Sequence, residues 1–292
     1  MAASHLNRIP VIYSPHLVAQ AISYSPSSYK PKLVAEALAA STLPVRFVEP
    51  CPVSVEDLSR VHSPAFVKGI LSCDLFNGFG DQEPEVAKSL PYTCGAMLDA
   101  ARMATAELPA AALCSGFHHA GYGSCHGFCT FNGLMVAAAA LLAEGHVSHV
   151  AIVDADMHVG DGTDDILGLI DGLEERIQHI SLGREHRARH HAQAYLETMR
   201  GLGQAFRESR PDLILYQAGA DPHVNDPLGG VLTSEELRER DRILFQIAHD
   251  QGIPMAWNLA GGYQRTEAGG IDPVVAIHLA TFEEAVQVYL TA

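Results

Sequence analysis

Val153-Asp154-Ala155-Asp156-Met157-His158-Val159-Gly160-Asp161-Gly162-Thr163 is the stretch that decides the fold. It continues an apolar run that predicts a buried strand, and its Gly/Asp/Thr end is suited to starting a helix. Residues i and i+2 of an extended segment share a face, so Asp156 and His158 are expected to point the same way. Open α/β sheets place their active sites at the carboxyl ends of strands, and these acids and this histidine stand at such an end. The alternative is a solvated turn with Asp161 as a helix N-cap.

The composition indicates a large core and argues against several classes of protein. Of the 292 residues, 48% are hydrophobic, which is ample for a substantial core. The formal net charge of −15 argues against a protein that binds nucleic acid irrespective of sequence, because such binding needs clustered Lys and Arg. No apolar run reaches membrane-spanning length, and residues 1–8 lack the hydrophobic core of a signal peptide.

The cysteine pattern indicates a reducing compartment. The six cysteines form no CxxC pair and no regular framework, which favours a reduced intracellular protein over a disulfide scaffold. They are Cys51, Cys73, Cys94, Cys114, Cys125 and Cys129. We therefore expect a cytoplasmic protein without a nucleic-acid or membrane partner, and the sequence indicates no oligomeric state.

Strand-like and helix-like segments alternate along the whole chain. Strands are expected at 10–13, 45–48, 110–114, 150–153, 177–182, 213–217 and 254–259. Helices are expected near 32–40, 92–107, 132–144, 191–206, 234–250 and 273–290, with a helix, a tight turn and a second helix at 58–67. This alternation predicts an α/β fold with a mostly parallel sheet flanked by helices. Because no low-complexity linker or internal repeat interrupts it, residues 1–292 are expected to form a single domain.

Unusual polar residues follow four of the expected strands. The segments are Gly116-Phe117-His118-His119, the stretch quoted above, Gly219-Ala220-Asp221 with Asn225-Asp226-Pro227-Leu228-Gly229-Gly230, and Gly261-Gly262-Tyr263. Each has a plain explanation when taken alone, such as an exposed histidine pair or a common Asp-Pro turn. A parallel sheet, however, gathers the loops after its strands at one edge, where a site would be assembled.

The chemistry of these residues fits a catalytic metal site. Asp156, His158 and Asp221 offer two oxygens and one nitrogen, a three-ligand set that leaves a position open for water and substrate. Zinc or iron(II) suits such a set, and the ligand types do not choose between them. A metal held there lowers the pKa of bound water and polarises a carbonyl.

The remaining polar residues fit the proton transfers of a hydrolysis. His118 and His119 are expected to act as general base and acid. Asp154 and Asp161 are expected to accept an imidazole N–H each and thereby to fix the tautomer. Tyr263 is expected to donate a hydrogen bond to the developing oxyanion.

At these residues the sequence resembles the histone deacetylase superfamily, whose arginase-like α/β fold hydrolyses N-acyl amides. The resemblance covers most of the chain and rests on several motifs in the right order. They are His118-His119 with Gly127-Phe128-Cys129, Asp154-x-Asp156-x-His158-x-Gly160-Asp161-Gly162-Thr163, Gly219-Ala220-Asp221 with Asp226-Pro227-Leu228-Gly229-Gly230, and Gly261-Gly262-Tyr263. The short length and the run 262–266 look most like the small class IV and bacterial members.

The resemblance also implies roles for individual residues. His119, with Asp161 behind it, would be the principal proton shuttle, and His118 an electrostatic partner. Substrate-binding positions would be Gly127, Phe128 and Leu228 in the tunnel wall. Asp81 would be an acceptor for the substrate backbone at the rim or a plain turn acid. A monovalent cation, K⁺, would bind near Asp154, Asp156, His158, Ser181 and Leu182.

Two departures from the family pattern concern the surroundings of the site. Val159 stands where many relatives have a second, non-ligating histidine. After Gly183 the expected Pro-Gly loop with its aromatic tunnel wall is missing, and a basic, His-rich run at 184–191 leads straight into a helix. One wall of the channel is therefore shortened or formed by other residues, and a wider mouth would admit bulkier acyl groups. The His-rich run is alternatively an exposed helix start.

The sequence thus predicts a zinc-dependent deacetylase, with iron(II) as the other metal. Its substrate would be an acylated lysine or amine, in a protein or a small molecule. Two alternatives are a two-manganese ureohydrolase of the related fold and a catalytically silent protein that binds acylated ligands. The ureohydrolase is disfavoured because His118 and His119 stand where a dimetal site would use carboxylates.

Overall fold

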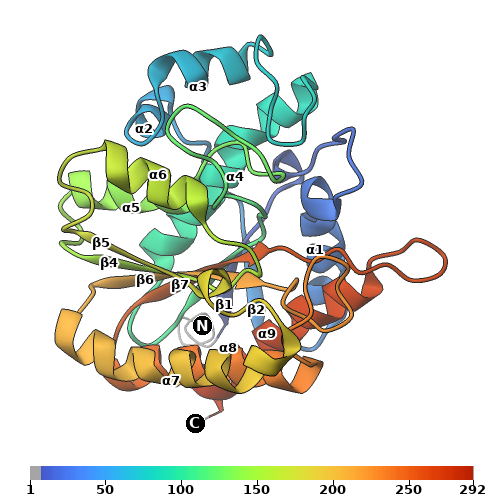
Figure 1. The fold of residues 1–292 in the computed structure, drawn as a ribbon, viewed down its shortest axis with the longest axis vertical. Coiled ribbons are helices and arrows are strands. Elements are labelled where there is room, and N and C mark those ends of the chain that lie inside the picture. Colours follow the sequence, from blue (N-terminus) through green and yellow to red (C-terminus); the bar gives the residue numbers. More distant parts are fainter. Residues whose placement is uncertain (1–7, 292) are drawn as a thin grey trace, which may run out of the picture.

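Seven parallel strands form one sheet in the computed structural model, which describes residues 8–291 (Figure 1). The order across the sheet is β2-β1-β3-β7-β6-β4-β5, and all six neighbouring pairs run parallel. The strands are β1 (Ile9–Ile12), β2 (Val45–Val48), β3 (Ala110–Ala112), β4 (Val150–Asp154), β5 (Ile177–Ser181), β6 (Leu213–Gly219) and β7 (Met255–Ala260). The predicted fold class is confirmed.

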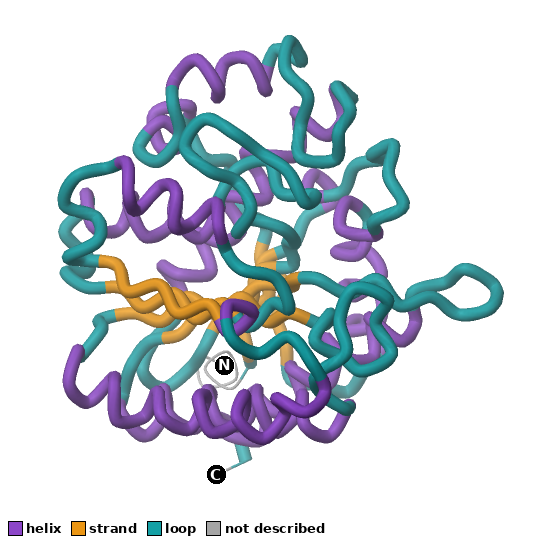
Figure 2. The backbone as a smooth tube through the Cα atoms, viewed as in Figure 1, coloured by secondary structure: helices purple, strands orange, loops and turns teal. Residues whose placement is uncertain are grey.

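Helices cover both faces of this sheet (Figures 1 and 2). On one face lie α2 (Val55–Ser59), α3 (Pro64–Leu71), α4 (Pro84–Met103), α5 (Gly133–Ala143) and α6 (Asp161–Leu169). On the other lie α1 (Lys30–Ala40), α7 (Ala192–Ser209), α8 (Ser234–Gln251) and α9 (Asp272–Leu290). Short 3-10 helices are η1 (Pro15–Leu17), η2 (Pro26–Ser28), η3 (Leu182–Arg184) and η4 (Arg189–His191).

The core is divided by the sheet into two apolar clusters. Alternate strand residues point to opposite faces, so Ile152 packs in the cluster under α4 and α5 while Val153 packs in the cluster over α7 and α8. The same alternation places Ala256 in the first cluster and Trp257 in the second. Burial on both faces explains why the strands read as continuous apolar runs.

Two helices differ from what the sequence predicts. The helix expected from residue 92 begins at Pro84 and passes through Pro91. Pro84 stands in the first turn, where proline is typical, and Pro91 lies inside the helix. The carbonyl of Pro91 accepts a hydrogen bond from the backbone N–H of Val53, 3.0 Å away. The second difference is α6, which starts at Asp161 as its first helical residue rather than as an N-cap.

Two further observations concern the cysteines and the apolar character of the helices. All six cysteines are free thiols in the part of the chain that the structure describes. Among residues 8–291, no helix combines the length and the apolar character needed to cross a membrane. The prediction about a signal peptide concerns residues that lie, apart from Arg8, outside the described part.

Candidate metal centre

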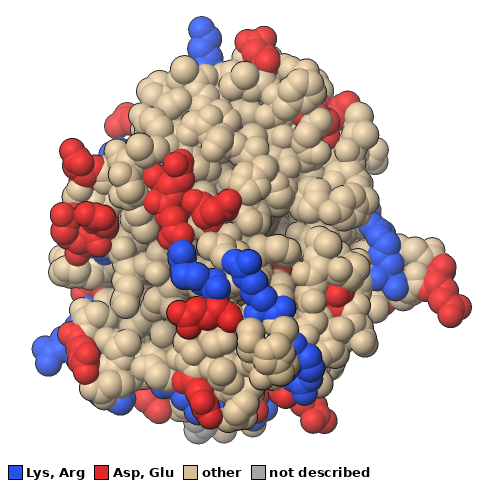
Figure 3. All heavy atoms as spheres, in the orientation of Figure 1, with Lys and Arg blue, Asp and Glu red and all other residues tan. Residues whose placement is uncertain are grey.

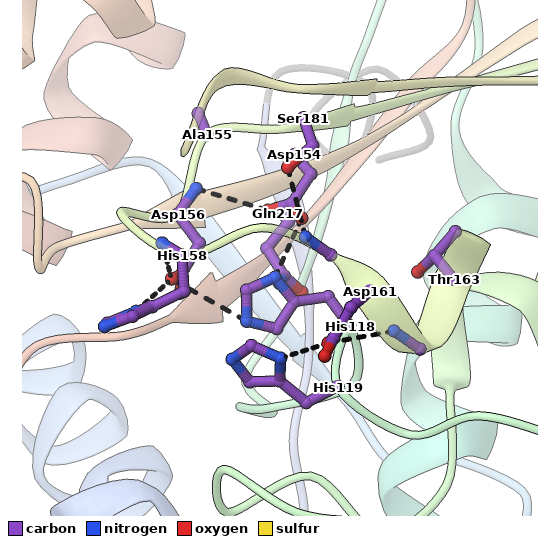
Figure 4. A network of polar contacts seen from close by, with 12 residues as sticks. His118, His119, Asp154, Ala155, Asp156, His158, Asp161, Thr163, Ser181 and Gln217 are labelled. Atoms are coloured by element: carbon purple, nitrogen blue, oxygen red, sulfur yellow. Dashed lines mark hydrogen bonds and ion pairs between the residues drawn. The ribbon is translucent and has the colours of Figure 1, made fainter. Parts of the chain in front are cut away.

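The four loops singled out in the sequence meet at one edge of the sheet. They leave β3, β7, β6 and β4, which are consecutive neighbours in the strand order. Because these strands run parallel, their carboxyl ends lie side by side and present the loop residues to one another. Figure 4 shows the resulting network of histidines and acids around the end of β4.

Asp156, His158 and Asp221 are brought together at the centre of this network. Nδ1 of His158 lies 3.0 Å from Oδ1 of Asp156 and 3.0 Å from Oδ2 of Asp221. The possible ligand atoms of the three side chains all lie within 4.8 Å of one another. The expected extended geometry is wrong in detail: β4 ends at Asp154, and a bend at 156–158 turns the two side chains toward the same point.

The electrostatics of this trio fit a divalent cation. Burial and the nearby charge of Asp156 raise the pKa of Asp221, while hydrogen bonds to both acids raise the pKa of His158 to about 10. Oδ2 of Asp221 is buried without a well-formed hydrogen bond among the described residues. The backbone N–H groups of Met157 and His158 donate to Oδ1 of Asp221 and to Oδ1 of Asp156 at 3.2 and 3.0 Å, and the His158 ring lies between the two carboxylates. A cation would satisfy the acceptor atoms of the two buried carboxylates that these donors leave unsatisfied.

The tandem histidines each contact one further carboxylate. Nδ1 of His118 lies 2.8 Å from Oδ2 of Asp154, and Nδ1 of His119 lies 2.6 Å from Oδ1 of Asp161. The centroids of the two rings are 4.1 Å apart. Nε2 of His118 lies 3.7 Å from Oδ1 of Asp156, one of the three candidate metal ligands. Figure 4 shows the two rings beside Asp154 and Asp161, with Asp156 and His158 close by. The arrangement fixes the orientation of each ring through its Nδ1.

The two histidines differ in charge although they are adjacent. Burial lowers the pKa of His118, but the charges of Asp154 and Asp156 outweigh it and raise this pKa to about 9. Burial and the positive charge of His118 lower the pKa of His119. Without a bound cation, His118 is therefore protonated at neutral pH while His119 is neutral and able to accept a proton.

Tyr263 approaches the site from the end of β7. Gly261 precedes it with φ +38°, and a Cβ on Gly261 would lie 2.2 Å from the carboxylate of Asp221, so only glycine fits there. The backbone N–H of Tyr263 donates to Oδ2 of Asp226 at 2.6 Å. Burial and the charges of Asp156 and Asp221 raise the pKa of Tyr263, so its hydroxyl remains a hydrogen-bond donor.

Lys30 donates hydrogen bonds to the backbone at the start of the Gly261-Gly262 turn. This first residue of α1 is completely buried, and its Nζ donates to the carbonyl of Ala260 at 3.2 Å and to that of Gly261. Burial lowers the pKa of Lys30 to about 8, against the opposing charge of Asp221. Nothing in the sequence indicates this role of Lys30, because it opens an ordinary helix and lies 230 positions from Ala260.

Gly127 and Phe128 form the rim beside His119. A Cβ on Gly127 would lie 2.4 Å from the His119 ring, so this glycine makes room for the histidine. Phe128 adopts φ +64°, a strained conformation for a bulky residue, at the edge of the site. Its ring packs edge-on against Tyr24 at 5.2 Å and lies 6.0 Å from Phe79.

The other rim residues have distinct surroundings. Leu228 is 39% exposed, and its N–H donates to Oδ1 of Asp226 at 3.0 Å. Asp81 is buried, accepts hydrogen bonds from the backbone N–H groups of Ile22 and Glu83 at 2.8 and 3.0 Å, and also contacts Asn77. The Asp81 carboxylate thus accepts hydrogen bonds from its own turn and from the loop that carries Tyr24. These contacts favour the interpretation of Asp81 as a turn acid.

The run that replaces the Pro-Gly loop is held by ion pairs to neighbouring helices. Arg184 pairs with Asp164, and Arg189 donates to Glu236 at 2.7 Å. Figure 3 shows basic side chains next to acidic ones on this face. His186 is buried and donates to or accepts from Thr198 at 3.0 Å, so the expectation of a uniformly exposed helix start is wrong for this residue.

The residues named for a monovalent cation surround Asp154. Ser181 pairs with Asp154 in the β4–β5 register, and its Oγ accepts from the backbone N–H of Gly160 at 3.1 Å. Leu182 is buried at the start of η3. Oδ1 of Asp154 accepts from the N–H of Asp156 at 3.2 Å.

Two further histidines contact this network. Nε2 of His126 lies 3.2 Å from Oδ2 of Asp161, and Nδ1 of His179 lies 2.8 Å from Oδ1 of Asp164. Nε2 of His179 lies 3.8 Å from Asp154. The only sequence signal for His126 was its place in the His/Gly-rich loop before Gly127, and His179 had none.

Comparison with known proteins shows the family of this chain. A family model described as histone deacetylase domain matches residues 25–187 and 176–275, which together extend over most of the chain. Histone deacetylase 2 of Arabidopsis thaliana is 27% identical over 252 residues, covering 76% of this chain and 64% of that protein. A probable deacetylase of Methanothermobacter thermautotrophicus is 26% identical over 269 residues, covering 80% of this chain and 78% of its own.

A solved structure shares the fold. The acetylpolyamine aminohydrolase from Burkholderia pseudomallei has a TM-score of 0.71 and 15% identity, covering 96% of this chain and 99% of that one. This likeness concerns the backbone arrangement. The chain spans less than two thirds of the plant relative, at 64% of its length.

Proposed function

Because the chain belongs to the histone deacetylase family, we propose that it is a metal-dependent deacetylase. Residues 1–292 would act as one catalytic domain that hydrolyses the amide between an acyl group, first of all acetyl, and a primary amine. The amine is the side chain of a lysine or a small molecule of the same chemistry.

One observation carries the proposal. Three ligand atoms of Asp156, His158 and Asp221 meet within 4.8 Å beside two histidine–carboxylate pairs and a protonated tyrosine. A structural metal site would be closed by a fourth protein ligand, whereas three ligands leave a position for a reacting group. Zinc suits the two oxygens and one nitrogen, and iron(II) is the other metal of the proposal.

The metal would supply a lowered pKa for bound water and polarise the substrate carbonyl. The protein residues would carry out the proton transfers. Neutral His119 accepts the proton of the attacking water at Nε2, while Asp161 holds its Nδ1 at 2.6 Å. The same nitrogen then donates that proton to the leaving amine, which departs as a neutral group.

His118 and Tyr263 would stabilise the negative charge that develops on the carbonyl oxygen. Asp154, whose Oδ2 lies 2.8 Å from Nδ1 of His118, favours the protonated imidazole, which would act through its positive charge. The Tyr263 hydroxyl donates a hydrogen bond, and the turn supported by Lys30 positions it. Together these groups favour the transition state over the planar amide.

The rim supports a broad acyl preference. Gly127, Phe128 and Leu228 would contact the substrate, with Tyr24 and Phe79 packed behind Phe128. The Pro-Gly loop of the family is missing after Gly183, so one wall would be shortened or formed by other residues, and acyl groups larger than acetyl are proposed as further substrates. A K⁺ ion near Asp154 and Ser181 would be a structural cation, as the family resemblance implies.

Hydrolysis of acylated amines by the zinc-loaded protein tests the proposal. A fluorogenic acetyl-lysine amide, a set of longer acyl-lysine amides and an acetylated polyamine would be assayed for release of the free acid. We expect turnover on at least one of them, blocked by a hydroxamate and by chelation. The matched control is Asp156→Asn, which keeps the size of the side chain but removes a ligand charge.

Two outcomes would contradict the proposal. Ligand binding without release of acid from any substrate would favour a catalytically silent binding protein. Two tightly bound manganese ions per chain, together with hydrolysis of a guanidino substrate, would favour a ureohydrolase.

A further inference from the structure

A second group of metal-ligating side chains lies on the solvent side of the tandem histidines. Oδ1 of Asp161 lies 2.6 Å from Nδ1 of His119, and Oδ2 lies 3.2 Å from Nε2 of His126. The rings of His119 and His126 are 4.7 Å apart. The possible ligand atoms of the three residues all lie within 4.8 Å of one another. One carboxylate thus contacts two imidazoles, each through a different oxygen.

The ligand set and its spacing suit zinc. Two imidazole nitrogens and a carboxylate oxygen are typical zinc ligands, and three of them leave one position for water. In a tetrahedral site with bonds of about 2.0–2.1 Å, ligand atoms stand roughly 3.3 Å apart. One possible ligand atom of each residue already lies within 4.8 Å of the other two, so a shift of the exposed His126 and Asp161 side chains would reach this spacing. A cation can therefore replace the hydrogen-bonding protons with small side-chain movements.

This group differs from the buried trio in its exposure. The side chains of Asp161 and His126 are 53% and 56% exposed, whereas those of Asp156 and Asp221 are 4% and 0% exposed. Exposed side chains lose more conformational freedom when they bind a cation, so the exposed group binds the cation more weakly. It is also open to direct exchange with the solvent.

We propose that His119, His126 and Asp161 form a second, weaker site for a zinc-class divalent cation, and that its occupation inhibits the enzyme. The binding stands on the geometry of the three residues alone. The inhibition rests on the proposed function, in which His119 is the proton acceptor.

The inhibition follows from the chemistry of imidazole. A neutral imidazole that binds a metal through Nδ1 carries its single proton on Nε2. Nε2 of His119 then has no lone pair for the proton of the attacking water. Asp161 is drawn to the same cation and no longer accepts the Nδ1 proton. Nε2 of His119 can therefore no longer accept a proton from the attacking water, although the buried trio is unchanged.

Metal binding to the one-zinc protein tests the proposal. His126→Gln removes one ligand, and His146→Gln is the matched control, because His146 is also exposed and pairs with a carboxylate, Glu144, at 2.9 Å. Bound zinc is measured by equilibrium dialysis and elemental analysis, and turnover is measured at each zinc concentration relative to the one-zinc form of the same variant.

We expect the wild-type protein and His146→Gln to bind a second equivalent and to lose activity as it binds. His126→Gln should bind this second equivalent at least tenfold more weakly and require at least tenfold more zinc for inhibition. Equal affinity in wild type and His126→Gln would overturn the site. Binding that leaves wild-type turnover unchanged would overturn the inhibition.

The two proposals fail in different ways. If the one-zinc protein hydrolyses no substrate, but the second zinc equivalent binds to the wild type and not to His126→Gln, the second metal site is supported and the proposed function is contradicted. If the one-zinc protein is active and no second equivalent binds, the site falls alone. Thermal unfolding of the zinc-free variants shows whether each is folded, as expected for a change at an exposed side chain.

Discussion

Nδ1 of His118 lies 2.8 Å from Oδ2 of Asp154, a carboxylate that is entirely shielded from solvent. The neighbouring pair of His119 and Asp161 has the same geometry but is partly exposed. The two pairs differ in the charges around them: the charges of Asp154 and Asp156 raise the pKa of His118 despite its burial, whereas burial and the positive charge of His118 lower the pKa of His119. In the metal-free protein one histidine is therefore protonated and the other is neutral.

Replacing the buried carboxylate should remove the charge on His118. In Asp154→Asn the imidazole loses its main anionic partner, so its pKa falls and the developing oxyanion loses a nearby positive charge. We expect kcat/KM to drop about 10- to 100-fold, the usual effect of losing such a supporting contact. Steady-state kinetics with measured zinc content checks this, with Asp212→Asn as a control far from the site. Wild-type kinetics in Asp154→Asn would contradict the assignment.

The neutral histidine should matter more than the charged one. His119→Ala removes the proton acceptor, and we expect turnover to fall by about 10²–10⁴-fold or to vanish. Zinc content should stay near one per chain in the absence of excess zinc, because the ligand trio is intact. His118→Ala should lose less activity. Normal rates in His119→Ala would refute its role, and loss of zinc would show that the change acts on the metal site instead.

Zinc binding should become tighter as the pH rises. Without a cation, hydrogen bonds to Asp156 and Asp221 raise the pKa of His158 to about 10, so this ligand is protonated at neutral pH. A metal binds only the neutral imidazole, so binding releases a proton. Affinity should then increase about tenfold for each proton released per pH unit. Competition dialysis at several pH values measures how zinc affinity changes with pH. A flat dependence would contradict the protonated state of His158 between Asp156 and Asp221 in the metal-free protein.

His62 should make the fold sensitive to mild acid. Its Nδ1 contacts the carbonyl of Gly121 at 2.8 Å and its Nε2 accepts from the backbone N–H of Asn132 at 2.9 Å, which requires the neutral ring. Burial lowers its pKa to about 4 from 6.5. Below pH 6.5 the unfolded chain binds a proton that the folded chain does not, so stability decreases as the pH falls toward 4.

The size of this effect follows from proton linkage. Between pH 7 and pH 5 the wild type should lose roughly 2 kcal/mol from this histidine, a loss that His62→Gln does not share. Urea unfolding at both pH values gives the comparison, and all other titrating groups are common to the two proteins. Identical pH dependence would mean that His62 is protonated in the folded state as well.

Lys30 should be required for the turn that carries Tyr263. In Lys30→Met the carbonyls of Ala260 and Gly261 lose their donor while the packing volume is nearly kept. We expect a loss of about 1–3 kcal/mol in the free energy of unfolding, the usual cost of unsatisfied buried polar groups. Urea unfolding measures it, and Lys32→Met, in the same helix but exposed, is the control. Equal stability of the two variants would contradict this role.

Features that depend on local pattern were predictable from the sequence, and features that depend on distant contacts were not. The strand Val45–Val48 follows from its own short apolar run. The start of α8 at Ser234 follows from the capping box at Thr233, which also lies within one segment of the sequence. The bend at 156–158 and the continuation of α4 through Pro91 depend on neighbouring elements. Lys30 joins the site only because β1 and β3 place α1 under the end of β7.

The metal-ligand and proton-transfer residues lie on loops directly after the central strands, whereas Tyr24 and Phe79 come from two other loops. Substrate choice and reactivity are thereby assigned largely to different parts of the backbone. Exchanging the loops of Tyr24 and Phe79 for ones of other length would give catalysts with new selectivity on the same scaffold, because the reacting groups stay anchored to the strand ends.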